Sequence, residues 1–128
     1  GALVLALRQP GRFASVSAFA PVVNPMDAPW GQKAFKNYLG EERGDWRQYD
    51  ACELVVKGVS RQPLFIDQGE ADAFLDEQLK PERLETVCRT NNHPLTLRRQ
   101  PGYDHSYFFI ASFIDDHLRY HAKYLKLL

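Results

Sequence analysis

An acid that follows a strand-like stretch and a histidine that precedes a helix-like stretch are the best candidates for chemistry in this sequence. Asp72 comes after the apolar run 64–66 and after Gly69, and His105 ends a loop that contains Gly102. A strand, a glycine turn and an acid, followed later by a loop, a histidine and a helix, is the layout of the acid and base of a Ser–Asp–His triad. The spacing therefore predicts that Asp72 and His105 work as a pair.

The chemistry expected of this pair is acyl transfer. A serine hydroxyl is a poor nucleophile at neutral pH, and it needs a base that removes its proton as it attacks. The imidazole of His105 can accept that proton and then give it to the leaving group. Asp72 would bind the other ring nitrogen and stabilise the imidazolium. Backbone N–H groups would hold the oxyanion.

The rest of the chain predicts strands that alternate with helices. This alternation indicates an α/β fold with a mostly parallel sheet and helices on both faces. Asp72 and His105 each come just after a predicted strand, so both are expected at the carboxyl edge of the sheet. Ligands collect at this edge in such folds. Apolar residues recur at helical spacing near the C-terminus, at Phe109, Ile110, Phe113, Ile114 and Leu118. Helices are expected over 1–8, 31–38, 46–56, 76–90 (with a new start at Pro81) and 106–125, and strands over 13–20, 64–66 and 95–99.

Alternative roles for these residues stay open at this point. A histidine at a helix N-terminus is, taken alone, more often a solvated cap than a catalytic base. An acid on the same edge favours the catalytic interpretation. Asp67, at the strand end, and Asp104, beside His105, compete with Asp72 as the acid. Asp72 is preferred because the triad acid follows its strand by a few residues, whereas the side chain of Asp104 is expected to point away.

Composition excludes several classes of function. The 128 residues suffice for one domain with a core, and 16 basic and 16 acidic side chains give zero net charge. Nothing therefore favours binding to nucleic acid or to an anionic membrane, and no apolar window reaches membrane-spanning length. Cys52 and Cys88 lack C-x-x-C spacing and are expected to be free thiols in a reducing compartment. The sequence predicts a cytoplasmic globular protein that needs no cofactor.

Two further groups of residues are weaker candidates. His117 and His121 have the i, i+4 spacing of metal ligands on a helix, but no third ligand is apparent, so they are expected to be ordinary surface residues and no metal site is predicted. Trp30 is a candidate wall of a substrate pocket. Phe35 and Tyr38 are weaker candidates for that wall, since aromatic residues at such spacing belong more often to a core.

Several short motifs follow one another along the whole chain. Through them the sequence resembles the S-formylglutathione hydrolase family, also called esterase D. The resemblance implies the C-terminal half of an α/β-hydrolase domain, with Asp72 as the triad acid and His105 as the base. It also implies hydrolysis of S-formylglutathione to formate and glutathione, in formaldehyde detoxification, and of simple esters. The motifs are SVSAFAP (15–21), PWGQKAF (29–35), YLG (38–40), IDQG with DAF (66–69 and 72–74), GYDHSY (102–107), and DH with HAKYL (116–117 and 121–125).

The nucleophile of this family is not expected within the chain. The family's Gly-x-Ser-x-Gly elbow would lie just before Gly1, and the chain begins inside an apolar helix. Residues 1–128 are thus expected to pair with an N-terminal half of the same protein, and a homodimer is a further option. The alternative function is a non-catalytic α/β-hydrolase relative that serves as a binding or structural module. None of the serines has the elbow context: Ser15, Ser17, Ser60, Ser106 and Ser112.

Overall fold

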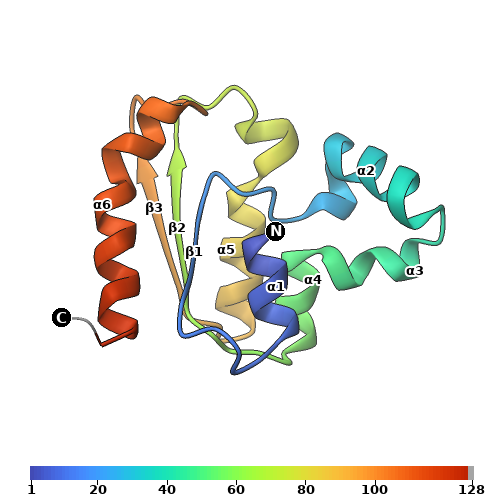
Figure 1. Ribbon diagram of the computed structural model, residues 1–128. Helices are drawn as coiled ribbons and strands as arrows, with labels where there is room; N and C mark the ends of the chain where they lie inside the picture. The colour runs from blue at the N-terminus through green and yellow to red at the C-terminus, as the bar shows by residue number, and fades with distance from the viewer. Residues whose placement is uncertain (127–128) are drawn as a thin grey trace.

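The computed structural model describes residues 1–126 as helices packed around a small sheet (Figure 1). No helix within these residues is both long and apolar enough to span a membrane. In chain order, the elements are α1 (Ala2–Arg8), β1 (Val16–Phe19), η1 (Pro25–Asp27), α2 (Pro29–Leu39), α3 (Arg43–Trp46), η2 (Arg47–Tyr49), α4 (Ala51–Lys57), β2 (Leu64–Gly69), η3 (Leu75–Leu79), α5 (Pro81–Thr90), β3 (Leu95–Gln100) and α6 (Tyr107–Tyr124).

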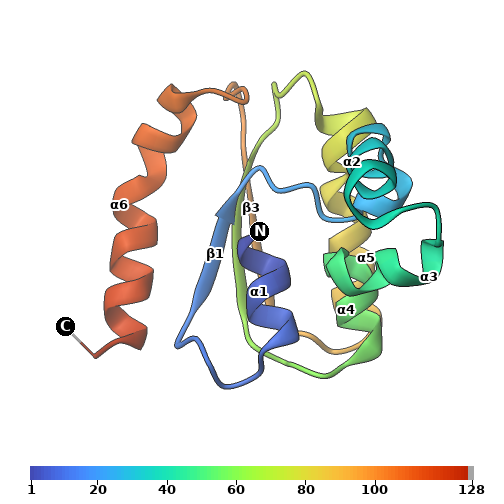
Figure 2. The same cartoon turned by 45° about the vertical axis from the view of Figure 1, so that its right-hand side comes forward.

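The sheet has three strands in the order β1-β2-β3, and both pairings are parallel. Ile66 in the central strand lies opposite Ala18 of β1 and Leu97 of β3. Helix α6 covers one face, and α1, α4 and α5 cover the other, as the two views of the ribbon show (Figures 1 and 2). The predicted α/β architecture with helices on both faces is confirmed. Because the strands are parallel, their carboxyl ends meet at one edge.

The main core lies between the sheet and the layer formed by α1, α4 and α5. Leu64 and Ile66 of β2 pack there with Leu7, Val55 and Leu84, and each of these side chains is 1% exposed. Alternate residues of a strand face opposite sides, so the intervening side chains of β2 face α6 instead. Burial of each large apolar side chain stabilises the fold by about 1.5–3 kcal/mol.

Both cysteines lie in this core as free thiols, as the sequence predicts. Burial raises the pKa of Cys88 to about 11. Burial also raises the pKa of Cys52, and the nearby carboxylate of Asp50 adds to the effect. Thiols held protonated in this way are poor nucleophiles, so these two residues are packing residues.

The continuous helix predicted over 46–56 is wrong. Helix α3 and the turn η2 come first, and α4 begins only after Asp50. The buried carboxylate of Asp50 caps α4 by accepting the N–H of Glu53 at 3.1 Å. It also accepts the side-chain amide of Asn24 at 2.8 Å and the N–H of Met26 at 3.0 Å. Apolar periodicity cannot reveal this break, because these last two donors come from a distant segment.

The strand bounds also differ from the prediction. β1 is shorter than 13–20, whereas β2 is longer than 64–66 and β3 extends to Gln100. Asp67 and Gln68 continue the ladder of β2 and are both fully buried. Polar residues ended the predicted strand, but Arg98 of β3 and His117 of α6 bind the Asp67 side chain inside the sheet. Asp67 therefore lies within a strand and not at its end.

The other helices begin and end largely as predicted. α2 begins at Pro29 and stops at Gly40, whose φ of 84° favours glycine. η3 is interrupted by Lys80, and α5 starts afresh at Pro81. In α6 only part of the apolar set faces the sheet: Phe109 is buried, whereas Leu118 is 59% exposed.

Candidate active site

Asp72 and His105 meet at the carboxyl edge of the sheet. Asp72 follows β2 after a two-residue turn, and His105 ends the loop between β3 and α6. Nδ1 of His105 lies 2.7 Å from Oδ2 of Asp72. The Asp72 side chain is fully buried, whereas that of His105 is 39% exposed. The structure thus brings together the pair that the sequence singled out, with the acid shielded and the imidazole accessible.

The carboxylate of Asp72 is fixed by two donors besides His105. Its Oδ1 accepts the N–H of Phe74 at 2.8 Å, a local turn that Asp side chains form readily. Its Oδ2 accepts Nε2 of Gln68 at 3.2 Å. These contacts hold the plane of the carboxylate, so Oδ2 is directed at the imidazole.

A glycine allows the two loops that carry the pair to touch. The N–H of Ala71 donates to the carbonyl of Tyr103 at 2.9 Å, which joins the turn after β2 to the loop after β3. A Cβ on Gly69 would overlap this same carbonyl group. The absence of a side chain at Gly69 therefore permits the close approach that places His105 beside Asp72.

Aromatic side chains extend from His105 to Trp30. The ring of Phe74 meets the imidazole edge-on at a centroid distance of 5.4 Å, and Trp30 lies 4.5 Å from Phe74. Both rings are partly exposed. Phe35 instead packs against Trp46. Trp30 thus reaches the site through Phe74, which the sequence analysis did not select.

Asp67 and Asp104, the competing acids, lie elsewhere. Asp67 accepts hydrogen bonds from Nε and Nη2 of Arg98, both at 2.7 Å, and from Nε2 of His117 at 2.8 Å. Burial raises the pKa of Asp67, but the hydrogen bonds from these two residues and from Gln100 outweigh it, so the net pKa is lowered. Asp104 is exposed. The carboxylate bound to His105 is that of Asp72.

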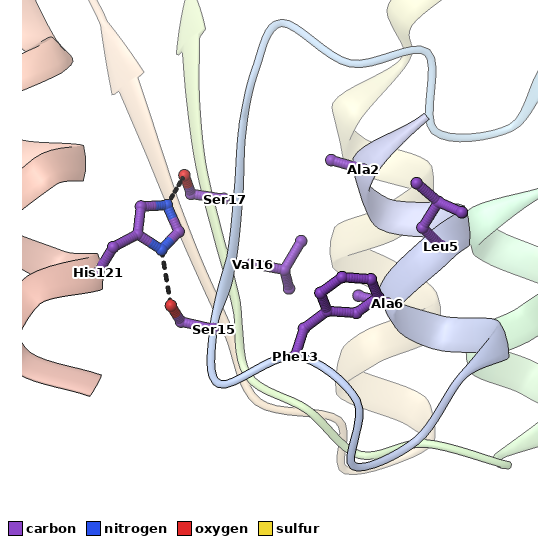
Figure 3. A pocket seen from close by; sticks show the side chains of 8 residues that line it. All are labelled: Ala2, Leu5, Ala6, Phe13, Ser15, Val16, Ser17 and His121. Atoms are coloured by element: carbon purple, nitrogen blue, oxygen red, sulfur yellow. Dashed lines mark hydrogen bonds between the residues drawn. The ribbon is translucent and has the colours of Figure 1, made fainter. Parts of the chain in front are cut away.

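The expectation that His117 and His121 are ordinary surface residues is wrong. His117 is 2% exposed and lies between Asp67 and Ser17, with Nδ1 2.7 Å from Oγ of Ser17. The ring of His121 lies between two serines, 2.8 Å from Ser17 and 2.6 Å from Ser15 (Figure 3). The buried face of α6 meets polar side chains of β1 and β2, and the histidines bind these. Within residues 1–126, no three His, Cys, Asp or Glu side chains form a metal-binding group.

The partners of the histidines fix the direction of these hydrogen bonds. The ionised Asp67 can only accept, so Nε2 of His117 donates to it, and in the neutral form of the imidazole Nδ1 is the acceptor. The hydroxyl of Ser17 then donates to His117 and accepts from Nε2 of His121, whose Nδ1 accepts from Ser15. Burial, followed by the nearby His117, lowers the pKa of His121 and favours its neutral form. A one-directional hydrogen-bond relay therefore fastens α6 to the sheet.

One end of this relay borders a cavity of about 270 Å³. Ala2, Leu5 and Ala6 of α1 line it, together with Phe13 and the strand residues beside Ser15 (Figure 3). Neither Asp72 nor His105 is among its lining residues. The cavity lies along β1, one of the two edge strands of the sheet within residues 1–126, and is separate from the Asp72–His105 site.

Comparison with known proteins agrees with the architecture and with the motifs. A model of the Esterase family matches residues 1–120. The solved structure of an S-formylglutathione hydrolase from Agrobacterium tumefaciens is 50% identical in sequence to this chain and superposes with a TM-score of 0.93. The match covers 98% of this chain and 45% of the hydrolase, so the chain spans less than half the length of that relative. The resemblance inferred from the motifs is confirmed, and the chain belongs to the Esterase family.

Proposed function

We propose that the protein containing this chain is a serine-type hydrolase of carboxylic esters and thioesters, with S-formylglutathione as its substrate. The observation that carries the proposal is the 2.7 Å contact between His105 and a buried Asp72 at the carboxyl edge of the sheet. Membership of the Esterase family and 50% identity to an S-formylglutathione hydrolase support the same chemistry. In this proposal the protein is cytoplasmic and its substrate is a small molecule.

His105 acts as the general base and Asp72 as its orienting acid. Because Nδ1 of His105 donates to Asp72, the neutral imidazole carries its lone pair on Nε2. Nε2 would take the proton of the attacking serine and return it to the leaving thiolate or alkoxide. The buried charge of Asp72 stabilises the imidazolium formed in between.

The nucleophile is proposed to lie in an N-terminal half of the same protein, so that residues 1–128 form the C-terminal part of one α/β-hydrolase domain. Ser17 has a Ser–His–Asp arrangement of its own, through His117 and Asp67, but this histidine is buried and Ser17 also accepts from His121. Ser17 is therefore a structural residue. Of the other serines, Ser60 binds the N–H of Gln62.

The aromatic pair of Trp30 and Phe74 is proposed to contact the substrate. Phe74 touches the imidazole edge-on, and both rings leave part of their surface exposed. The backbone N–H of Trp30 donates to Gln78 at 3.0 Å, which fixes the start of α2 beside η3. A flat apolar wall at this distance from the base suits an acyl group or the carbon atoms of a thiol leaving group.

The test is hydrolysis by the complete protein. We expect turnover of S-formylglutathione and of p-nitrophenyl acetate, and we expect His105→Ala to lower kcat by several orders of magnitude with little change in KM. Asp104→Asn is the control, since Asp104 lies beside the histidine but is exposed. Near-parental kcat in His105→Ala would sink the proposal, and absence of turnover in the parent would favour a non-catalytic binding or structural module.

A further inference from the structure

Gln68 is a buried amide that the triad chemistry leaves without a role. It follows Asp67 in β2 and faces the opposite side of the sheet, the side of Leu64 and Ile66. The residue is fully buried. Its Nε2 donates to Oδ2 of Asp72 at 3.2 Å and to the carbonyl of Gly69 at 3.1 Å.

The orientation of this amide follows from its neighbours. Both neighbours of Nε2 are acceptors, namely a carboxylate and a carbonyl. A flipped amide would place Oε1 of Gln68 against the same two oxygens, and both contacts would be repulsive. The N–H groups of Gln68 therefore face Asp72 and Gly69, and both are used.

Placing Gln68 here leaves one polar atom unpaired. Its Oε1 is buried and has no hydrogen-bond partner within residues 1–126. An unpaired buried oxygen destabilises a fold, and an apolar side chain of similar size would avoid that cost. The amide group at this position is therefore poorly explained by packing alone, whereas its contact with Asp72 accounts for it.

We propose that Gln68 is a positioning residue that holds the Asp72 carboxylate in register with His105, an inference that rests on the proposed function. Oδ2 of Asp72 accepts from both Gln68 and His105, so the amide limits rotation of the carboxylate that the imidazole needs. A neutral donor suits this task. A Lys or Arg in its place would pair with Asp72 and weaken the negative charge that stabilises the imidazolium.

The test compares Gln68→Met with Gln62→Met in the complete protein. Gln62 is a matched control because it also has a buried Oε1 without a partner in the described part of the chain and an Nε2 bound to a carbonyl, at the opposite end of β2. Gln68→Met should lower kcat roughly tenfold to a hundredfold with KM unchanged. The acidic limb of its pH–rate profile should move to higher pH, because the carboxylate loses a donor and holds the imidazolium more strongly. Gln62→Met should change neither kcat nor the acidic limb of the pH–rate profile.

A conservative variant covers the case in which Gln68→Met does not fold. Gln68→Glu keeps the size of the side chain and can donate to Asp72 only while it is protonated. Its kcat should approach the parental value at low pH and fall along a new basic limb. A profile without that limb, or a folded Gln68→Met with parental kcat and pH profile, overturns the proposal.

A spectroscopic readout separates this proposal from the proposed function. The hydrogen-bonded proton on Nδ1 of His105 should be observable by NMR in the parent, and its chemical shift should change in Gln68→Met and stay the same in Gln62→Met. If the parent has no hydrolase activity, the proposed function fails, but this shift still tests the positioning of Asp72. An unchanged Nδ1 proton in Gln68→Met overturns the positioning role.

Discussion

Asp67 and Asp72 are near neighbours in the chain, yet each accepts a hydrogen bond from a different histidine. Oδ2 of Asp67 lies 2.8 Å from Nε2 of His117 inside α6, and Oδ2 of Asp72 lies 2.7 Å from Nδ1 of His105 in the preceding loop. The first pair is closed off on all sides, whereas the imidazole of the second is accessible. The same chemical groups thus fasten a helix in one place and leave the proposed base accessible in the other.

Substitution of the two acids should separate these roles. Asp72→Asn in the complete protein should lower kcat by about 10⁴, because the amide would hold the wrong tautomer of His105. Asp67→Asn should mainly lower the free energy of unfolding, by about 3 kcal/mol, because it breaks a buried pair with Arg98. Ester hydrolysis and urea denaturation of both variants check this. The reverse pattern would show that Asp67 is the catalytic acid.

Gly69→Ala should damage both stability and activity. The new methyl group would overlap the carbonyl of Tyr103, and the loops that carry Asp72 and His105 would have to separate. We expect a lower Tm and a kcat reduced roughly a hundredfold. Gly44→Ala is the matched control, since a Cβ there meets no atom within 4 Å and alanine favours the helix. Equal behaviour of the two variants would contradict the steric argument.

The relay between α6 and β1 should make stability depend on pH. The pKa of His121 is lowered from its ordinary value of 6.5 by burial and by His117. Below pH 6.5 the unfolded chain binds a proton that the folded chain does not, so stability is lost as pH falls from 6.5 toward the lowered pKa. For a single group this loss cannot exceed about 1.4 kcal/mol per pH unit. His121→Gln should give a shallower dependence in urea titrations between pH 7 and about 5. An unchanged slope would remove His121 as its source.

Residues 1–128 alone should neither hydrolyse esters nor form a stable monomer. Within the described residues β1 has a neighbour on one side only, and Leu5 of α1 beside it is 52% exposed. An unpaired strand edge next to apolar surface promotes association. Size-exclusion chromatography with hydrogen exchange checks this. A sharp monomer peak with strongly protected amides in 16–19 would show an autonomous domain.

The sequence was sufficient for the features that depend on local signals. Gly69, the spacing to Asp72 and the loop before α6 are short-range patterns, and they predicted the pairing of Asp72 with His105. Proline at position 81 likewise marked the start of α5. The alternation of strands with helices predicted the parallel sheet that the structure has.

The features that were missed depend on contacts between distant segments. His117 and Asp67 are 50 residues apart, and only the docking of α6 on β2 brings them together. A polar residue in a helix is expected to be exposed unless a buried polar partner is known. Both histidines of α6 were therefore assigned to the surface. The cap at Asp50 was missed for the same reason, since two of its donors lie in 24–26.

The relay in α6 also sets a mechanical constraint on the site. The helix begins just after His105, and His117 anchors it about 15 Å further along its axis, at 1.5 Å per residue. Because a helix is stiff, a small rotation of α6 about His117 also moves its first turn. A tilt of about 4° around His117 would displace the first turn of α6 by about 1 Å, and a misplacement of that size at a reacting group can slow a reaction about a hundredfold. The anchor at His117, in the middle of α6, would therefore help to align the proposed base, which it never touches.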